Sequence, residues 1–218
     1  MIVREVGFTL RPGRVTCLMG RNGVGKTTLL KTIMGVVRAK KGSVRYEETE
    51  LIGSAPSARA RLGIGYVPQG REIFPQLTVE ENVLLGMEAS PKKARVGKVP
   101  QHIYDRFPVL YEMKNRKGGD LSGGQQQQLA FARALVGEPK MLLLDEPTEG
   151  IQPNIVQDIS RLIKGLREEG ISVLLVEQSL LFARETADDF LVLDKGAIVA
   201  QGEIADLNEN IVRRHLTV

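Results

Sequence analysis

Eight residues near the start of the chain have the spacing of a phosphate-binding loop. Their pattern is G-x-x-x-x-G-K-[S/T], and they are Gly20, Arg21, Asn22, Gly23, Val24, Gly25, Lys26 and Thr27, followed by Thr28. Gly23 and Gly25 allow the backbone to curl close to an anion, and the amide groups that open the next helix point toward it. Lys26 supplies a positive charge for the β- and γ-phosphates, and Thr27 supplies a hydroxyl for Mg²⁺. The loop therefore predicts a site for a nucleoside triphosphate and magnesium.

The flanking residues have the character that such a loop requires. An apolar run of strand length, residues 15–19, precedes the loop, and residues 28–34 read as a helix. The alternative is a glycine-rich turn that only caps a helix. Agreement at all eight positions, in a strand–loop–helix context, favours the phosphate site.

Two acids follow a second apolar strand. Residues 140–145 end in Asp145, and Glu146 comes next. In phosphate-loop enzymes an acid at the end of a buried strand holds Mg²⁺, and a neighbouring acid can accept a proton from the attacking water. Alone, the pair could be two acids in a solvated loop. With the phosphate loop upstream, we expect Asp145 as a metal ligand and Glu146 as the base.

A third segment has the character of an anion-binding helix start. It consists of Leu121, Ser122, Gly123, Gly124 and Gln125. Its small residues expose the serine and the first amide groups of the following helix. Since the chain already has one phosphate loop, this segment is expected to grip the γ-phosphate of a nucleotide bound elsewhere.

The remaining pattern predicts an α/β fold. Strands are predicted at residues 2–10, 15–19, 42–46, 62–69, 140–145, 171–176, 190–193 and 197–200, the last two as a hairpin. Helices are predicted at residues 28–35, 56–61, 78–85, 102–110, 124–136, 154–168 and 210–218. Thr78 and Glu81 have the spacing of a capping box. Residues 91–100 are predicted to be a loop.

Composition narrows the class of protein. The chain has 218 residues, 42% of them hydrophobic, which suffices for one domain. No apolar run approaches the roughly 20 residues of a membrane span, and no leader precedes the first strand. The single cysteine, Cys17, is expected in the core and suits a reducing compartment. A net charge of +4 is spread among interleaved acids and bases, with basic runs at residues 38–41 and 91–98 that we interpret as solvated loops.

These motifs, in this order, resemble the ATP-binding subunits of ABC transporters, and the resemblance covers nearly the whole chain. It implies a RecA-like P-loop core, approximately residues 1–69 and 137–218, with an inserted α-helical lobe at 70–136. It also implies head-to-tail pairing, in which each ATP lies between one subunit's phosphate loop and the other's signature segment, here residues 121–125. Gln69 would then sense Mg²⁺ and the attacking water, as a metal ligand and catalytic residue, and Glu146 would be the base.

The finer resemblance is to importers of branched-chain amino acids and urea. Residues 66–74, Y-V-P-Q-G-R-E-I-F, resemble both, and residues 119–120, 125–128 and 147–153 are more similar to the urea type. The resemblance implies import of urea or short amides, with branched-chain amino acids as the alternative. It further implies a second, non-identical ATP-binding subunit, two membrane permease subunits, a periplasmic binding protein acting indirectly, and a peripheral position on the cytoplasmic face of the membrane.

Three positions depart from the family pattern. Gln178 stands at the switch position, where the family usually has histidine; His102 and His215 are interpreted as surface residues. Glutamine can orient water but cannot carry a proton as imidazolium does. Gln152 stands where an aspartate is usual. No aromatic residue matches the usual adenine platform, Phe8 and Tyr46 being poorly placed, so either the start is truncated or adenine is held differently.

Two other classes of protein remain as alternatives. A soluble, non-transport ABC ATPase acting on nucleic acid or ribosomes would suit the sequence pI of about 9.2. The chain has no long coiled-coil insertion and no second ATPase module, so no nucleic-acid partner is expected. A nucleotide-binding module without catalysis would suit Gln178, but Glu146 argues against it.

Overall fold

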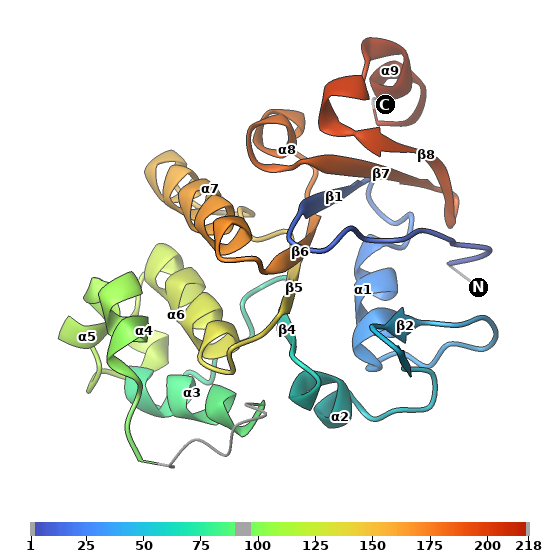
Figure 1. Ribbon diagram of the computed structural model, residues 1–218. Helices are drawn as coiled ribbons and strands as arrows, with labels where there is room; N and C mark the ends of the chain where they lie inside the picture. Colours follow the sequence, from blue (N-terminus) through green and yellow to red (C-terminus); the bar gives the residue numbers. More distant parts are fainter. Residues whose placement is uncertain (1–2, 90–96, 217–218) are drawn as a thin grey trace.

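The computed structural model describes residues 3–89 and 97–216. A sheet in the order β4-β5-β6-β1-β7-β8 forms its centre (Figure 1). The bounds of its strands are β1 Val15–Met19, β4 Ile64–Val67, β5 Met141–Asp145, β6 Ser172–Val176, β7 Asp189–Asp194 and β8 Ala197–Glu203. Neighbouring strands are parallel except for β7 and β8, which pair antiparallel. The predicted RecA-like α/β P-loop fold is therefore confirmed.

The sequence pattern explains why the central strands are parallel. Every residue of β1 and β5 is buried, as are all of β6 except Ser172. Strands with continuous apolar sequence are stable only where both faces of the sheet are covered. Cys17 is among these buried residues, as predicted, and its burial raises the pKa of the thiol.

Helices cover both faces. Helix α1 (Lys26–Met34) and helix α2 (Pro56–Arg61) lie on one side, where Leu29, Leu30 and Ile33 pack in a core with Leu18 and Leu174. Helices α6 (Gly123–Leu135), α7 (Pro153–Glu168) and α8 (Leu180–Thr186) lie on the other. Because successive side chains of a strand point to opposite faces, the strands contribute to two separate hydrophobic cores, one on each side of the sheet.

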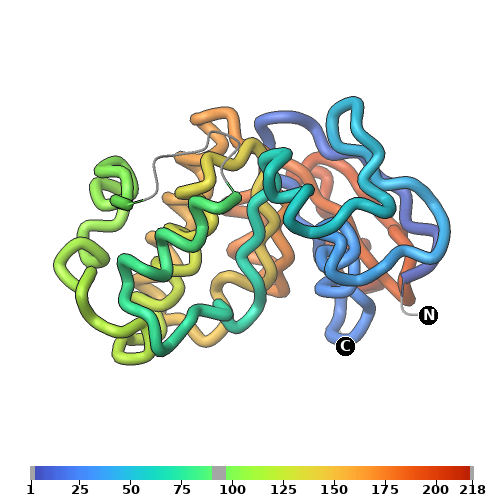
Figure 2. The backbone as a smooth tube through the Cα atoms, turned by 90° about the horizontal axis from the view of Figure 1, so that it is seen from below, coloured from blue at the N-terminus to red at the C-terminus, as the bar shows by residue number. Residues whose placement is uncertain are grey.

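In the described part of the chain between β4 and β5, the regular elements are helices. They are α3 (Val79–Gly86), α4 (Gln101–Arg106), α5 (Pro108–Glu112) and α6, with 3₁₀ turns at Met87–Ala89 and Gly118–Asp120. In Figure 2 this green and yellow stretch gathers on the side away from the two marked termini. Helix α3 begins with the predicted capping box, in which Thr78 and Glu81 bond each other's backbone. The proposed lobe boundaries at residues 70 and 136 stay a prediction.

One predicted strand is wrong. The described part of residues 2–10 contains no strand. Val3, Val6, Phe8 and Leu10 still pack against the core, so the alternation correctly predicts which side chains face inward. A strand also needs a ladder partner. The backbone contact found here is a bond from the Arg4 amide to the Gly196 carbonyl, 2.7 Å long.

Other boundaries are corrected by local chemistry. The predicted helix 102–110 is two helices, because Pro108 removes an amide donor and Phe107 leaves the helical region at φ −128° and ψ 70°. The predicted strand 42–46 is reduced to β2 (Arg45–Tyr46), which pairs with β3 (Thr49–Glu50). Helix α8 was not predicted, because seven residues show too little of the helical period. Most of the predicted 91–100 loop, with its basic run, lies outside the described residues.

The end of the chain returns to the sheet. The β7–β8 hairpin is confirmed, with left-handed Lys195 and Gly196 in its turn. A 3₁₀ turn (Ile204–Asp206) and helix α9 (Glu209–His215) follow. His102 is exposed as predicted, whereas His215 is only partly exposed. Its side chain is 18% exposed, and its Nδ1 lies 3.5 Å from Asp194, because α9 packs back on the core.

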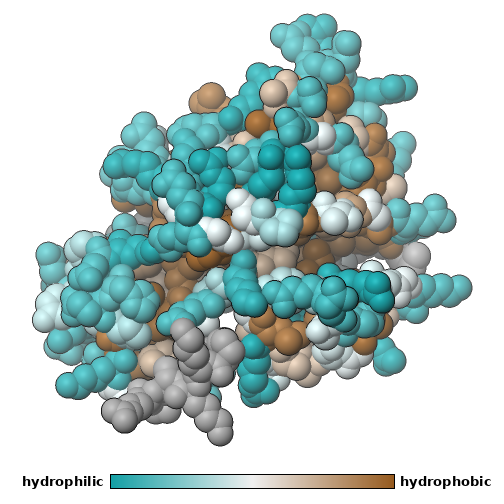
Figure 3. Space-filling model, in the orientation of Figure 1, coloured by the Kyte–Doolittle hydropathy of each residue, from teal (hydrophilic) through white to brown (hydrophobic). Residues whose placement is uncertain are grey.

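Polar side chains cover most of the face shown in Figure 3, and apolar ones lie mainly in the hollows between them. Within the described ranges, no helix combines the length and the hydropathy that a membrane crossing needs.

Candidate functional site

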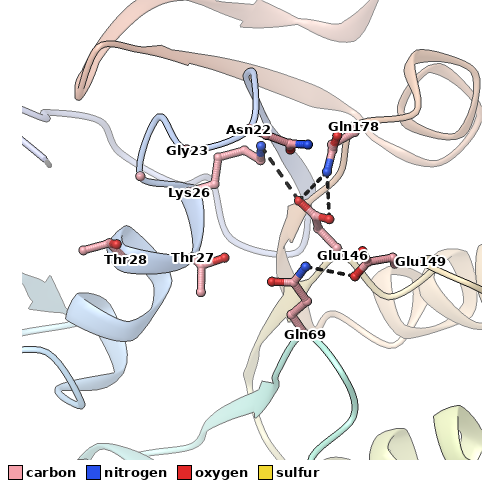
Figure 4. A pocket seen from close by; sticks show the side chains of 10 residues that line it. Asn22, Gly23, Lys26, Thr27, Thr28, Gln69, Glu146, Glu149 and Gln178 are labelled. Carbon is pink, nitrogen blue, oxygen red and sulfur yellow. Dashed lines mark hydrogen bonds and ion pairs between the residues drawn. The ribbon is translucent and has the colours of Figure 1, made fainter.

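Four loops meet at the carboxyl ends of neighbouring parallel strands. They follow β1, β4, β5 and β6, and they enclose a cavity of about 340 Å³ (Figure 4). This edge of an open α/β sheet is where such folds bind ligands. The cavity is lined by Asn22, Gly23, Gly25, Lys26, Thr27, Thr28, Gln69, Glu146, Glu149 and Gln178. The fold thus brings together the phosphate loop, Gln69, Glu146 and Gln178.

The phosphate loop uses its glycines as the sequence predicts. Gly23 and Gly25 have φ of 78° and 110°, values that favour glycine. At Gly20 a β-carbon would lie 2.4 Å from the carbonyl oxygen of Leu193, so only glycine fits against β7. Residues of the curled loop and of the first turn of α1 line the cavity, and the unpaired amide groups of such a helix start can bind an anion.

Lys26 lies at the centre of this loop and is 5% exposed. Its Nζ donates to the carbonyl oxygens of Gly20 at 2.7 Å and Arg21 at 3.1 Å. Glu146 Oε1 lies 3.8 Å from the same nitrogen. Burial lowers the pKa of Lys26, and the nearby carboxylates of Glu146 and Asp145 oppose that shift. The loop thus holds a partly desolvated cation ready for a polyanion.

Thr27 and Asp145 meet behind the loop. The Thr27 hydroxyl donates to Asp145 Oδ1 at 3.1 Å, and the Tyr66 hydroxyl lies 3.5 Å from Oδ2. Asp145 is fully buried, and this desolvation raises the pKa of its carboxyl. A buried carboxylate with few protein donors is poorly compensated, and a bound cation would stabilise it.

Glu146 faces the cavity from the loop after β5. Its backbone is left-handed, with φ 47°, and its amide donates to the Val176 carbonyl at 3.0 Å. The side-chain nitrogen of Gln178 donates to both carboxylate oxygens of Glu146, each at 2.8 Å. Figure 4 shows this pair beside Lys26. The glutamine at the switch position therefore contacts the predicted base directly.

Gln69 lies on the opposite wall. Its Nε2 donates to Glu149 Oε2 at 2.9 Å, and Figure 4 shows its oxygen on the side of Thr27. Sequence reasoning did not single out Glu149 as a site residue. Its position in the same loop as Glu146, three residues further on, was the available signal.

Glu177 was also missed. It is 3% exposed and accepts bonds from the Thr148 amide at 3.2 Å, the Thr148 hydroxyl at 2.7 Å and the Gln178 amide at 3.2 Å. Burial raises the pKa of Glu177, although these hydrogen bonds oppose the shift. This carboxylate ties the loop after β5 to the loop after β6.

The signature segment lies elsewhere. Ser122 caps α6 in a capping box with Gln125, and its side chain is exposed. Leu121 is buried, whereas Gly123 and Gly124 are partly exposed. None of these residues lines the cavity around Lys26. The fold thus leaves this helix start outside the cavity of the chain's own phosphate loop.

The other two departures from the family pattern are Gln152 and the missing aromatic platform for adenine. Gln152 is exposed at the start of α7 and makes no side-chain cap there. Phe8 and Tyr46 pack against the core around α1 and do not line the cavity. In the described part of the chain, no aromatic residue lines the cavity.

The oxygen groups at the cavity wall, and Asp145 directly behind Thr27, suit magnesium and phosphate. The hydroxyl of Thr27, the carboxylate of Asp145 and the amide oxygen of Gln69 are hard oxygen ligands. Magnesium keeps several waters and substrate oxygens, so few protein ligands are needed. Over residues 3–89 and 97–216, no group of three or more histidine, cysteine and acidic residues suggests a different metal.

The fold and the cavity define a P-loop nucleoside-triphosphate-binding protein with a RecA-like core. The sequence profile of the ABC transporter family matches residues 3–149. The chain therefore belongs to the ABC transporter family. It is an ATP-binding protein of the class that hydrolyses ATP to power transport.

Individual proteins similar to this chain are also ATP-binding proteins. The high-affinity branched-chain amino acid transport ATP-binding protein BraG of Pseudomonas aeruginosa is 42% identical, over 95% of this chain and 89% of its own. A probable branched-chain amino acid transport ATP-binding protein, LivF, of Archaeoglobus fulgidus is 36% identical, over 96% and 89%. Among solved structures, a dimeric ATP-binding cassette in a post-hydrolysis state with ADP and phosphate has a TM-score of 0.81 at 27% identity, over 93% and 90%.

Proposed function

We propose that this chain is an ATP-hydrolysing subunit of an importer for branched-chain amino acids. The observation that carries the proposal is the 42% identity to BraG over 95% of the chain, combined with the assembled cavity. Both relatives described above are named for branched-chain amino acid transport. They therefore favour branched-chain amino acids, the alternative that the sequence left open, over urea.

Import of urea or short amides is the second candidate. The segments at 119–120, 125–128 and 147–153 favour it. One of them contains Glu149, which contacts Gln69 inside the cavity. The relatives described above do not support this finer assignment.

In this proposal the chain's own residues divide the work of hydrolysis. Lys26 and the loop amides hold the phosphates. Glu146 accepts the proton of the attacking water, and Gln178 holds the Glu146 carboxylate in place through two hydrogen bonds. Thr27, Asp145 and Gln69 would hold Mg²⁺, which when bound neutralises charge on the phosphate oxygens.

A second subunit completes the site. Ser122 is exposed and lies outside the cavity, so the signature segment is free to meet another subunit's nucleotide. The related cassette with ADP and phosphate is described as dimeric. Pairing would place this helix start against the γ-phosphate, as anions favour helix N-termini.

The same proposal places the chain on the cytoplasmic face of the membrane, bound to two permease subunits and served by a periplasmic binding protein. A non-identical ATP-binding subunit is the proposed partner. No nucleic-acid partner is proposed, and salt-sensitive binding to DNA or RNA would contradict that.

Transport by the assembled complex tests the substrate. We expect uptake of leucine, isoleucine and valine to stop when this subunit is deleted and to return with the wild-type chain. Loss of urea uptake with unchanged amino-acid uptake would support the second candidate instead. If neither changes, the importer proposal is wrong.

A further inference from the structure

We propose that Glu149 is a positioning residue that sets the orientation of the Gln69 amide, so that its oxygen faces the magnesium site. The inference rests on the proposed function, because it takes Gln69 as a metal ligand.

The hydrogen-bonding chemistry of the two groups supports this. The two ends of a glutamine amide differ, since Oε1 only accepts and Nε2 only donates. An ionised glutamate can only accept. The 2.9 Å contact between Gln69 and Glu149 therefore requires Nε2 on the Glu149 side and leaves Oε1 on the other. That other side is where Thr27 lies (Figure 4).

The backbone holds Glu149 where this contact needs it. The Glu149 amide donates to the Glu146 carbonyl at 3.2 Å, and Ile151 donates to Thr148 at 3.2 Å. Left-handed Gly150, with φ 64°, completes this turn. The turn thus carries the proposed base and the proposed positioning residue together, and it reaches Gln69 in the loop after β4.

The oxygens on the Thr27 side form a consistent set. Thr27 and Asp145 already contact each other at 3.1 Å. An amide oxygen facing them adds a third hard ligand, whereas a flipped amide would present hydrogens to the cation. Glu149 thus removes the unproductive orientation before the metal arrives.

Titrations of a fluorescent ATP analogue with Mg²⁺ test the inference without using turnover. For Glu149→Ala and Glu149→Gln we expect the Mg²⁺ concentration giving half of the metal-dependent gain in affinity to rise roughly 3- to 10-fold, the scale of one hydrogen bond. The affinity for the ATP analogue measured in EDTA, without free Mg²⁺, should stay unchanged. Glu149→Asp keeps a pure acceptor and should restore much of the effect, which a merely structural role would not predict.

Two further variants make the result decisive. Glu112→Ala, at an exposed glutamate on α5 outside the cavity, should leave the titration unchanged. In a Gln69→Ala background, Glu149→Ala should add nothing. If Gln69→Ala raises the Mg²⁺ requirement but the Glu149 variants do not, the positioning role is wrong. If Gln69→Ala and Thr27→Ala both leave it unchanged, the proposed metal ligands are wrong, and the inference falls with them.

Discussion

At the scale of single residues, the site is built from amide–carboxylate pairs. Gln178 holds Glu146 with two 2.8 Å bonds, and Gln69 is held by Glu149 at 2.9 Å. An amide cannot change charge with pH as a histidine can. The switch position here therefore orients the proposed base by geometry alone.

The first residue-scale prediction concerns Glu146. Glu146→Gln removes the proton acceptor but keeps the size of the side chain, so we expect hydrolysis to slow roughly 10²- to 10⁴-fold with ATP affinity preserved. Single-turnover assays and nucleotide titrations separate the two quantities. Lys26→Ala should instead weaken ATP binding itself. Undiminished turnover by Glu146→Gln would contradict its role as base.

The second residue-scale prediction concerns the pH dependence of stability that Glu177 produces. Because burial raises the pKa of Glu177, the folded state binds its proton more tightly than the unfolded state does. The contribution to stability is complete below the unfolded value of about 4.3 and is lost as pH rises through the folded pKa. We therefore expect the free energy of unfolding of the wild type, relative to Glu177→Gln, to fall between acidic and neutral pH.

Urea unfolding at several pH values measures that difference. Thr148→Val removes a hydroxyl that favours the ionised form, so it should make the fall larger. A difference that grows with pH would show that hydrogen bonding outweighs burial at Glu177.

At the scale of elements, the phosphate-loop helix is secured at its far end by one buried arginine. Arg59, 4% exposed, donates to the carbonyl oxygens of Thr32 at 2.9 Å, Ile33 at 2.6 Å and Leu51 at 2.6 Å. A cation at a helix C-terminus also opposes the negative end of the helix dipole. Burial lowers the pKa of Arg59, but a guanidinium stays charged.

Replacing this arginine should destabilise the fold. Arg59→Met removes the guanidinium bonds to these three carbonyl oxygens, of which those of Thr32 and Leu51 still accept from the Gly35 and Ser54 amides. We therefore expect a loss of roughly 1–3 kcal/mol in the free energy of unfolding. Denaturant unfolding checks it. The matched control is Arg61→Met. Arg61 is exposed and lies on α2 like Arg59, so this variant should change stability little. Equal effects of the two variants would contradict the capping role.

At the scale of the whole molecule, one chain carries two helix starts that we propose to bind phosphate, and they do not line the same cavity. Helix α1 begins in the cavity, and helix α6 begins at exposed Ser122 outside it. Two helix starts that do not contribute to the same cavity suit a nucleotide site that a second subunit completes. The proposed pairing makes the position of Ser122 testable without disturbing the chain's own phosphate loop.

Ser122→Asp tests the pairing. Aspartate caps a helix as well as serine, so the fold should be preserved, but its charge should repel a facing γ-phosphate. We expect ATP-dependent association of the Glu146→Gln chain, with itself or with a partner ATP-binding subunit, to be lost in sedimentation experiments. Thr78→Asp, at the capping box of α3, is the matched control. Association that survives Ser122→Asp would exclude this contact.

The sequence by itself determined the phosphate loop, the buried strands and the acids that follow them, because these depend on local spacing and apolar runs. Only the tertiary structure decided which side chains meet. The strand order places β6 between β1 and β5, which puts Gln178 against Glu146. Residues 3–10 form no strand, since a strand needs a partner that no local pattern encodes. The contact of Glu149 with Gln69 likewise joins loops 80 residues apart.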